Sequence, residues 1–152
     1  MPRNFEIGAD VHVLVINGPN LGRLDLRESN IYGDFSYEEL KQAIEAAAKE
    51  LGLSVDVRQS DDEATIVGWL HEASDRKLPV VINPAAFTHY SYAIRDALAM
   101  VKSHKVEVHL SNPLAREEFR HTSVASGVVT GTIAGFGIDS YRLALRALKG
   151  FS

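Results

Sequence analysis

Short apolar runs alternate along this chain with longer segments in which apolar residues recur every three or four positions. Short runs rich in Val, Ile and Leu are typical of buried β-strands, whereas the longer spacing is typical of amphipathic helices. Turn-forming residues separate the two kinds of segment, as Asn17-Gly18-Pro19-Asn20 does after the first run. The pattern predicts strands at residues 11–16, 53–58, 79–84, 105–110 and 127–134.

The predicted helices have recognisable starts. Ser36 and Glu39 are spaced as a capping box, in which the Ser36 hydroxyl accepts from the Glu39 amide and the Glu39 carboxylate reaches back. Asp61 or Asp62 is the candidate cap of the second helix. The apolar stripes are Leu40, Ile44, Ala47 and Leu51 in the first helix, Ile66, Leu70 and Ala73 in the second, and Ile94, Ala97, Leu98 and Val101 in a third over residues 90–101, with a helical turn at 114–119 and a closing helix at 140–149.

Strands and helices therefore alternate five times, which predicts a parallel sheet covered by helices on both faces. For a sheet of this kind the leading topology is the flavodoxin-like order 2-1-3-4-5, a three-layer α/β sandwich. A chain of 152 residues fits one domain. Residues 1–152 are therefore interpreted as a single flavodoxin-like domain with a short N-terminal tail at residues 1–9.

Composition narrows the class of protein. An apolar content of 45% and a charged content of 24% are ordinary for a soluble domain. A net charge of −4 argues against a general nucleic-acid binder, and the absence of cysteine rules out disulfides and thiolate zinc sites. No apolar run approaches the roughly 20 residues of a membrane span. Because the first residues lack the apolar core of a signal peptide, a cytoplasmic protein that binds no membrane is expected.

The segment from Gly18 to Phe35 has no clear period, although it directly follows the first strand. A loop of this length inside a compact domain is usually either functional or disordered. It leaves the carboxyl end of a strand, where ligands bind in open α/β sheets, and it carries Asn20, Arg27 and Tyr32. We therefore interpret it as a lid over a site.

Polar residues follow two further strands at the same predicted edge of the sheet. Asn83 ends the third strand and is followed by His89, while His109 and Ser111 mark the end of the fourth. Because the carboxyl ends of parallel strands share one edge, these side chains are expected to converge with the lid on a single crevice. Arg116 and Arg120 lie just beyond.

Each of these residues also has a purely structural interpretation. Asparagines beside Gly or Pro are common turn residues, and His89 could cap the helix that follows it. Arg116 and Arg120 could form a solvated helix face, and Tyr32 could be a packed loop aromatic. The sequence has no GxGxxG after the first strand, no GxxxxGK[ST], no GxSxG and no histidine pair at metal-ligand spacing. No nucleotide, cofactor or metal site is therefore expected.

Four motifs in order resemble type II 3-dehydroquinate dehydratases, the type II dehydroquinases. The resemblance extends from about Val11 to Leu148. The motifs are INGPNLGRL with LRE and IYG at residues 16–33, RQSDDEATIVGWLHEA at 58–73, VINPAAFTHYSYAIRDAL at 81–98 and VEVHLSNPLAREEFRH at 106–121.

The resemblance implies a flavodoxin-like fold and a cofactor-free, reversible dehydration of 3-dehydroquinate to 3-dehydroshikimate, in the shikimate or quinate pathway. It also implies a homo-oligomer, commonly a dodecamer built as a tetramer of trimers. Position by position, it implies Tyr32 as the base, Arg27 beside it, His109 as the general acid, and Asn20 as the residue that holds the enolate through a water. The implied substrate contacts are Asn83, His89, Leu110, Ser111, Arg120 and, from a neighbouring subunit, Asp96, with Glu107 and Arg116 in supporting roles.

The implied chemistry is physically reasonable for these residue types. Removing a proton α to a ketone produces an enolate, which needs donors aimed at its oxygen. Guanidinium groups beside a phenol favour its anionic form, as opposite charges generally do. His109 would then protonate the leaving hydroxyl in an anti elimination, while closure of the segment from Leu21 to Tyr32 would exclude water.

Two other interpretations remain open. A flavodoxin-like domain could bind a flavin or a small anion without catalysis. Alternatively, a member of the resembled family could have an altered substrate or a lowered activity, because several residues depart from the usual pattern. Asp25 and Ser29 stand where Gly and Pro are usual, Tyr90 is larger than the usual residue, Leu114 stands where His is usual, and Ala85-Ala86 stands where Gly-Gly or Gly-Ala is frequent.

Overall fold

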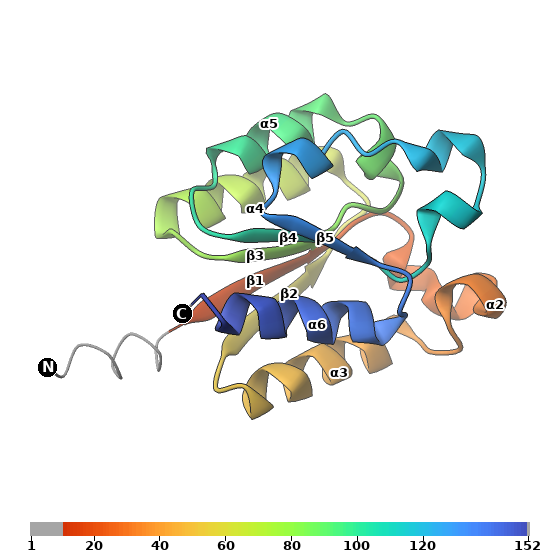
Figure 1. Ribbon diagram of the computed structural model, residues 1–152, viewed down its shortest axis with the longest axis horizontal. Helices are drawn as coiled ribbons and strands as arrows, with labels where there is room; N and C mark the ends of the chain where they lie inside the picture. The colour runs from red at the N-terminus through yellow and green to blue at the C-terminus, as the bar shows by residue number, and fades with distance from the viewer. Residues whose placement is uncertain (1–10, 152) are drawn as a thin grey trace, which may run out of the picture.

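A parallel β-sheet of five strands forms the centre of the computed structural model, which describes residues 11–151 (Figure 1). Neighbouring strands pair in parallel in the order β2-β1-β3-β4-β5, which confirms the topology predicted from the sequence. The predicted tail at residues 1–9 lies outside the described residues. The strands are β1 His12–Asn17, β2 Ser54–Gln59, β3 Val80–Asn83, β4 Lys105–His109 and β5 Gly131–Ala134.

Two pairs of helices cover the two faces of the sheet (Figure 1). Successive side chains of a strand point to opposite faces, so β1 contributes Val13 and Val15 to one core and Leu14 and Ile16 to the other. The first core packs against α3 and α6, and the second against α4 and α5. The helices are α3 Tyr37–Glu50, α4 Glu63–Arg76, α5 Tyr92–Met100 and α6 Ile138–Lys149.

Side-chain caps fix where three of these helices begin. Ser36 and Glu39 form the predicted capping box of α3. Asp62, one of the two predicted candidates, caps α4 by accepting from the Thr65 amide. Ser91 caps α5, so His89 does not have the capping role considered above, and the helix begins at Tyr92 rather than at residue 90.

The segments between strands and helices contain short helical turns that the apolar pattern did not separate. The lid contains η1 Leu21–Leu26 and α2 Ser29–Tyr32, and its Leu21 and Leu24 are buried. Single turns are too short to display a helical period, which explains why the lid looks irregular in the sequence. The others are η2 Ala85–His89, η3 Pro113–Ala115, η4 Glu118–His121 and η5 Ser126–Val128.

Two predicted boundaries near the C-terminus were wrong. The fifth strand begins at Gly131 rather than at residue 127, because Ser126–Val128 form the turn η5 and pairing with β4 begins at Gly131. The expected single turn at 114–119 is two turns, η3 and η4, with Arg116 extended between them. Within residues 11–151, no helix is both long and apolar enough to cross a membrane.

Candidate active site

A cavity of about 130 Å³ lies at the carboxyl edge of the sheet. The register places Asn17 beside Asn83 at the ends of β1 and β3, and His109 ends β4. This is the edge where ligands bind in open α/β sheets. The cavity is lined by Pro19, Asn20, Leu21, Arg27, Tyr32, Asn83, Ala85, Ala86, His89, His109, Leu110, Ser111, Pro113, Arg116 and Arg120.

Tyr32 lies between two guanidinium groups. Its phenol oxygen accepts hydrogen bonds from Arg27 and from Arg116, and its side chain is only 7% exposed. The Arg27 guanidinium carbon also lies 3.7 Å from the centre of the Tyr32 ring. Two positively charged groups therefore donate to one phenol oxygen, which makes both hydrogen bonds charge-assisted.

Arg27 keeps its charge in this position. The pKa of Arg27 is lowered overall, mainly by burial. The nearby Arg116 and Arg120 lower it further, whereas the interaction with Tyr32 opposes the change. Arginine titrates so far above neutrality that it stays protonated in proteins. The α2 turn therefore presents Tyr32 to the cavity with a permanent positive charge beside it.

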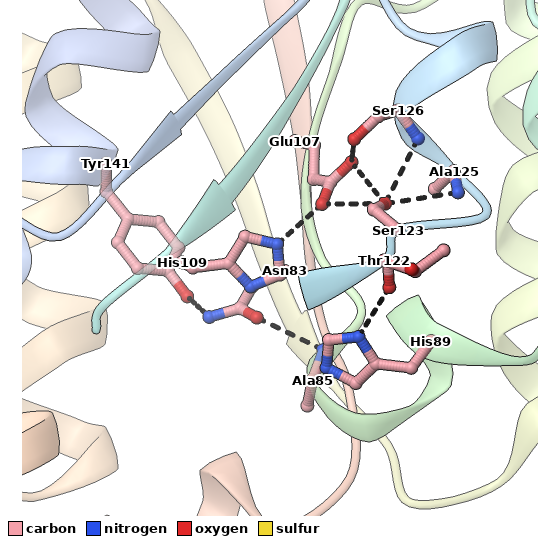
Figure 2. A network of polar contacts seen from close by, with 10 residues as sticks. All are labelled: Asn83, Ala85, His89, Glu107, His109, Thr122, Ser123, Ala125, Ser126 and Tyr141. Atoms are coloured by element: carbon pink, nitrogen blue, oxygen red, sulfur yellow. Dashed lines mark hydrogen bonds and ion pairs between the residues drawn. The ribbon is translucent and has the colours of Figure 1, made fainter. Parts of the chain in front are cut away.

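His109, which lines the cavity, forms a close pair with Glu107 behind it. His109 Nε2 lies 2.5 Å from Glu107 Oε2, and Glu107 is 1% exposed (Figure 2). Burial acts to raise the pKa of Glu107, but the hydrogen bonds from His109, Ser126 and Ser123 outweigh burial and lower it overall. Because Nε2 faces the ionised Glu107, Nδ1 is the ring nitrogen left for a substrate.

The loop after η4 supports both histidines of the cavity. Ser123 donates to both oxygens of Glu107 at 3.0 and 3.1 Å, and Ser126 donates to Oε1 at 3.0 Å. His89 Nδ1 lies 2.8 Å from the Thr122 carbonyl oxygen, as Figure 2 shows. Burial lowers the pKa of His89, while this backbone contact partly opposes the change. His89 is therefore favoured in its neutral form.

The two arginines after β4 share Glu117, with Nε 3.9 Å from Glu117 Oε1 for Arg116 and 2.7 Å for Arg120, but otherwise differ in their contacts. Arg116 donates to Ser111 Oγ at 3.2 Å as well as to Tyr32, so it links β4 to the lid. Arg120 Nε lies 2.7 Å from Glu117 Oε1 and also reaches the cavity. The expected pairing with Glu117 is present, but both arginine side chains are largely buried at the cavity rather than on a solvated face.

Asn20 and Asn83 both border the cavity, whereas Asn17 does not. Asn20 adopts a left-handed conformation with φ of 69°, and its backbone amide donates to Asp61 Oδ1 at 2.9 Å. Asn83 Oδ1 accepts from the Ala85 amide at 3.1 Å. The Asn17 side chain turns into the protein, where it contacts Tyr141 and the Arg58 carbonyl.

The structure brings together all but two of the residues singled out above. Glu107 lies behind the cavity wall, and Asp96 lies on α5 with its side chain 73% exposed, 3.7 Å from Arg95. Sequence reasoning missed Ser123 and Ser126, which carry no local motif, and the lining residues Pro19, Leu21, Ala85, Ala86 and Pro113. Within residues 11–151, no group of three or more histidine and carboxylate side chains is arranged to hold a metal ion.

Comparison with known proteins agrees with this geometry. The family model described as dehydroquinase class II matches residues 11–149. The 3-dehydroquinate dehydratase of Salinispora tropica is 54% identical over 138 residues, which cover 91% of this chain and 96% of that protein. The 3-dehydroquinate dehydratase of Mycobacteroides abscessus is 54% identical over 134 residues, covering 88% of this chain and 93% of that protein.

A solved structure gives the same result in three dimensions. The type II dehydroquinase from Propionibacterium acnes matches with a TM-score of 0.90 and 53% identity, covering 91% of this chain and 96% of that one. The fold and the cavity thus define a flavodoxin-like α/β protein in which a phenol–guanidinium cluster and a glutamate-paired histidine line one cavity. The chain belongs to the class II dehydroquinase family.

Proposed function

We propose that this protein is a 3-dehydroquinate dehydratase, a hydro-lyase that reversibly converts 3-dehydroquinate into 3-dehydroshikimate and water. Membership of the family supports the reaction and the substrate. The observation that carries the proposal is the placement of Tyr32, between Arg27 and Arg116, on the same small cavity as His109.

Tyr32 is the base in this proposal. As tyrosinate, its oxygen removes a proton from the carbon next to the ketone, and the electron pair of that C–H bond forms an enolate. Arg27 and Arg116 stabilise the tyrosinate because both donate to its oxygen. Asn20, at the entrance of the lid, holds the enolate oxygen through a water.

His109 is the acid that completes the elimination. Its Nδ1 proton passes to the leaving hydroxyl, the C–O bond breaks, and the enolate electrons form the new C=C bond with release of water. Tyr32 gains one proton and His109 loses one, so the pair is reset by proton exchange with solvent. The Glu107 carboxylate, 2.5 Å from Nε2, stabilises the protonated imidazolium before the transfer.

The remaining polar groups bind the substrate. The backbone amides at Leu110 and Ser111, with the Ser111 hydroxyl, suit the substrate carboxylate because they are donors at a strand end. Asn83, His89 and Arg120 suit its hydroxyl groups. The reaction needs no metal or cofactor, because both proton transfers use side chains.

We also propose that the working enzyme is a homo-oligomer, a dodecamer arranged as a tetramer of trimers, in the cytoplasm. In this assembly Asp96 of a neighbouring subunit reaches the cavity. The exposure of Asp96 within a single chain is compatible with that role. The reaction serves the shikimate or the quinate pathway. A mass from light scattering tests the assembly directly.

A continuous absorbance assay tests the activity. The product contains a C=C bond conjugated to its ketone, so turnover of 3-dehydroquinate produces a rising ultraviolet signal. Folded protein that gives no signal would reject the proposal. A pure binding module is the alternative, and saturable binding of a flavin without turnover would favour it.

A further inference from the structure

We propose that Tyr141, a buried residue of α6, is a positioning residue that holds the Asn83 amide in the orientation needed to donate to the substrate. The inference rests on the proposed function, in which Asn83 contacts the substrate. Tyr141 does not line the cavity itself. Figure 2 shows the Asn83 amide between the Tyr141 hydroxyl and the Ala85 backbone.

The Ala85 amide fixes the orientation of Asn83. A backbone N–H can only donate, so the group 3.1 Å away must be the carbonyl oxygen of the Asn83 side chain, Oδ1. The Asn83 amide nitrogen must therefore face the Tyr141 hydroxyl, 2.9 Å away. Tyr141 accepts one of the two hydrogens on this nitrogen, and the second is left for the cavity that Asn83 lines.

The same reasoning fixes the direction of the next contacts. Since the Tyr141 oxygen accepts from Asn83, its own hydrogen is free to donate to Asn17 Oδ1, 2.6 Å away. Asn17 Nδ2 then donates to the Arg58 carbonyl at 3.2 Å. A backbone N–H begins this chain of hydrogen bonds and a backbone carbonyl ends it. Reversing the chain would place two donors or two acceptors against each other at its ends, so its direction is fixed.

Burial makes the arrangement rigid and independent of pH. Tyr141 and Asn17 are fully buried, and Asn83 is 3% exposed. Burial raises the pKa of Tyr141 above its ordinary value, although the Asn83 hydrogen bond opposes this, so the phenol keeps its proton. In Tyr141→Phe, the Asn83 nitrogen and the Asn17 oxygen would both lose a buried partner. Only the Ala85 amide would then hold the Asn83 side chain, at Oδ1, and the Asn83 nitrogen would be less firmly placed because χ2 has no sharp preference of its own.

Kinetics of Tyr141→Phe test the inference after wild-type turnover has been established, since an inactive wild type would refute the proposed function instead. We expect kcat/KM for 3-dehydroquinate to fall at least tenfold, mainly because KM rises, when the assay is run well below the melting temperature of the variant. The matched control is Ser140→Ala. It also removes a fully buried hydroxyl from α6, but that hydroxyl accepts from the Phe136 amide at 3.1 Å and is not part of the Asn83–Tyr141–Asn17 chain. Its kinetic constants should stay within twofold of wild type.

A double-mutant cycle separates positioning from general destabilisation. If Tyr141 acts through Asn83, adding Tyr141→Phe to Asn83→Ala should not lower kcat/KM further. A Tyr141→Phe protein that melts at a lower temperature but keeps wild-type kcat/KM would overturn the inference. Equal losses of kcat/KM from Tyr141→Phe in the presence and absence of Asn83 would also overturn it.

Discussion

The phenol oxygen of Tyr32 accepts a hydrogen bond from Arg116, although the two residues are 84 positions apart in the sequence. The contact joins the lid after β1 to the segment after β4, while Arg27 holds the same oxygen from within the lid. The cluster thus depends on the tertiary fold as well as on the local turn. This arrangement makes several outcomes measurable.

Tyr32→Phe should lower kcat about 10²–10⁴-fold, the usual contribution of a general base. The substitution removes only the hydroxyl, so the ring still packs in the lid. The measurement is steady-state turnover of 3-dehydroquinate, with circular dichroism to verify the fold. Near-normal turnover in a folded variant would remove Tyr32 as the base.

Arg27→Ala and Arg116→Ala should each reduce kcat at least tenfold, because each removes a charged donor from the Tyr32 oxygen. Arg116→Lys should recover little of the loss, since Lys has a single nitrogen on a shorter side chain and cannot reproduce the fork in which one nitrogen of Arg116 contacts Ser111 and another contacts Tyr32. Arg142→Ala is the control, because the pair that Arg142 forms with Asp139 on α6 is exposed and does not involve Tyr32. Wild-type kcat in both alanine variants would contradict this role.

Glu72→Gln should reduce stability at neutral pH by up to about 1 kcal/mol, in the range of exposed ion pairs. Hydrogen bonds from Arg58 and Arg76 lower the pKa of Glu72 from 4.5 to about 2. When folding lowers the pKa of a carboxyl group, that group stabilises the folded protein at pH values above its unfolded-state pKa. This stabilisation is lost as the pH falls through the folded-state pKa. Urea unfolding at several pH values should therefore show the two proteins converging between pH 4.5 and about 2. A constant difference across that range would contradict the assignment.

Ala85→Gly should stabilise the protein by about 0.5–1 kcal/mol. Ala85 has φ of 54°, a left-handed conformation that costs a residue with a Cβ roughly 1–2 kcal/mol and costs glycine little. Part of the gain is offset because glycine loses more entropy on folding. Urea unfolding measures the change, and Ala86→Gly serves as a control without positive φ that should destabilise. Lower stability of Ala85→Gly would refute the strain at this position.

Asp25→Gly should leave turnover within about twofold of wild type. The negative charge of Asp25 in the lid raised the possibility that it weakens the effect of Arg27 on Tyr32. Asp25 is exposed, and the structure records no ion pair between it and Arg27. Water screens such a charge strongly. A several-fold faster variant would instead identify Asp25 as a brake on the reaction.

The sequence was sufficient for the architecture because each strand carries its own signal. Val13, Val15, Leu14 and Ile16 form one uninterrupted apolar run because β1 is covered on both faces. The ends of the strands then located Asn83 and His109 at one edge. The predicted family and strand order are confirmed.

Features that depend on long-range contacts could not be predicted in this way. Asn17 ends β1 beside Asn83, yet its side chain faces inward because Tyr141, 124 residues later, supplies its partner. Tyr141 itself belongs to the apolar stripe of α6, so the sequence pattern predicts a core residue and gives no indication that its hydroxyl has a polar role. Ser126 shows its role only when the loop returns to Glu107. The roles of the cavity residues in catalysis remain predictions.

The seating of Tyr32 has a consequence for the timing of the reaction. A side chain already ordered between two guanidinium groups is preorganised, so the cost of immobilising it is met during folding rather than by substrate binding. The same contacts must loosen when the lid admits substrate and discharges product. Stronger hydrogen bonds to the Tyr32 phenol would therefore favour the proton-transfer steps but slow substrate entry and product release. Lid opening would then limit the turnover rate.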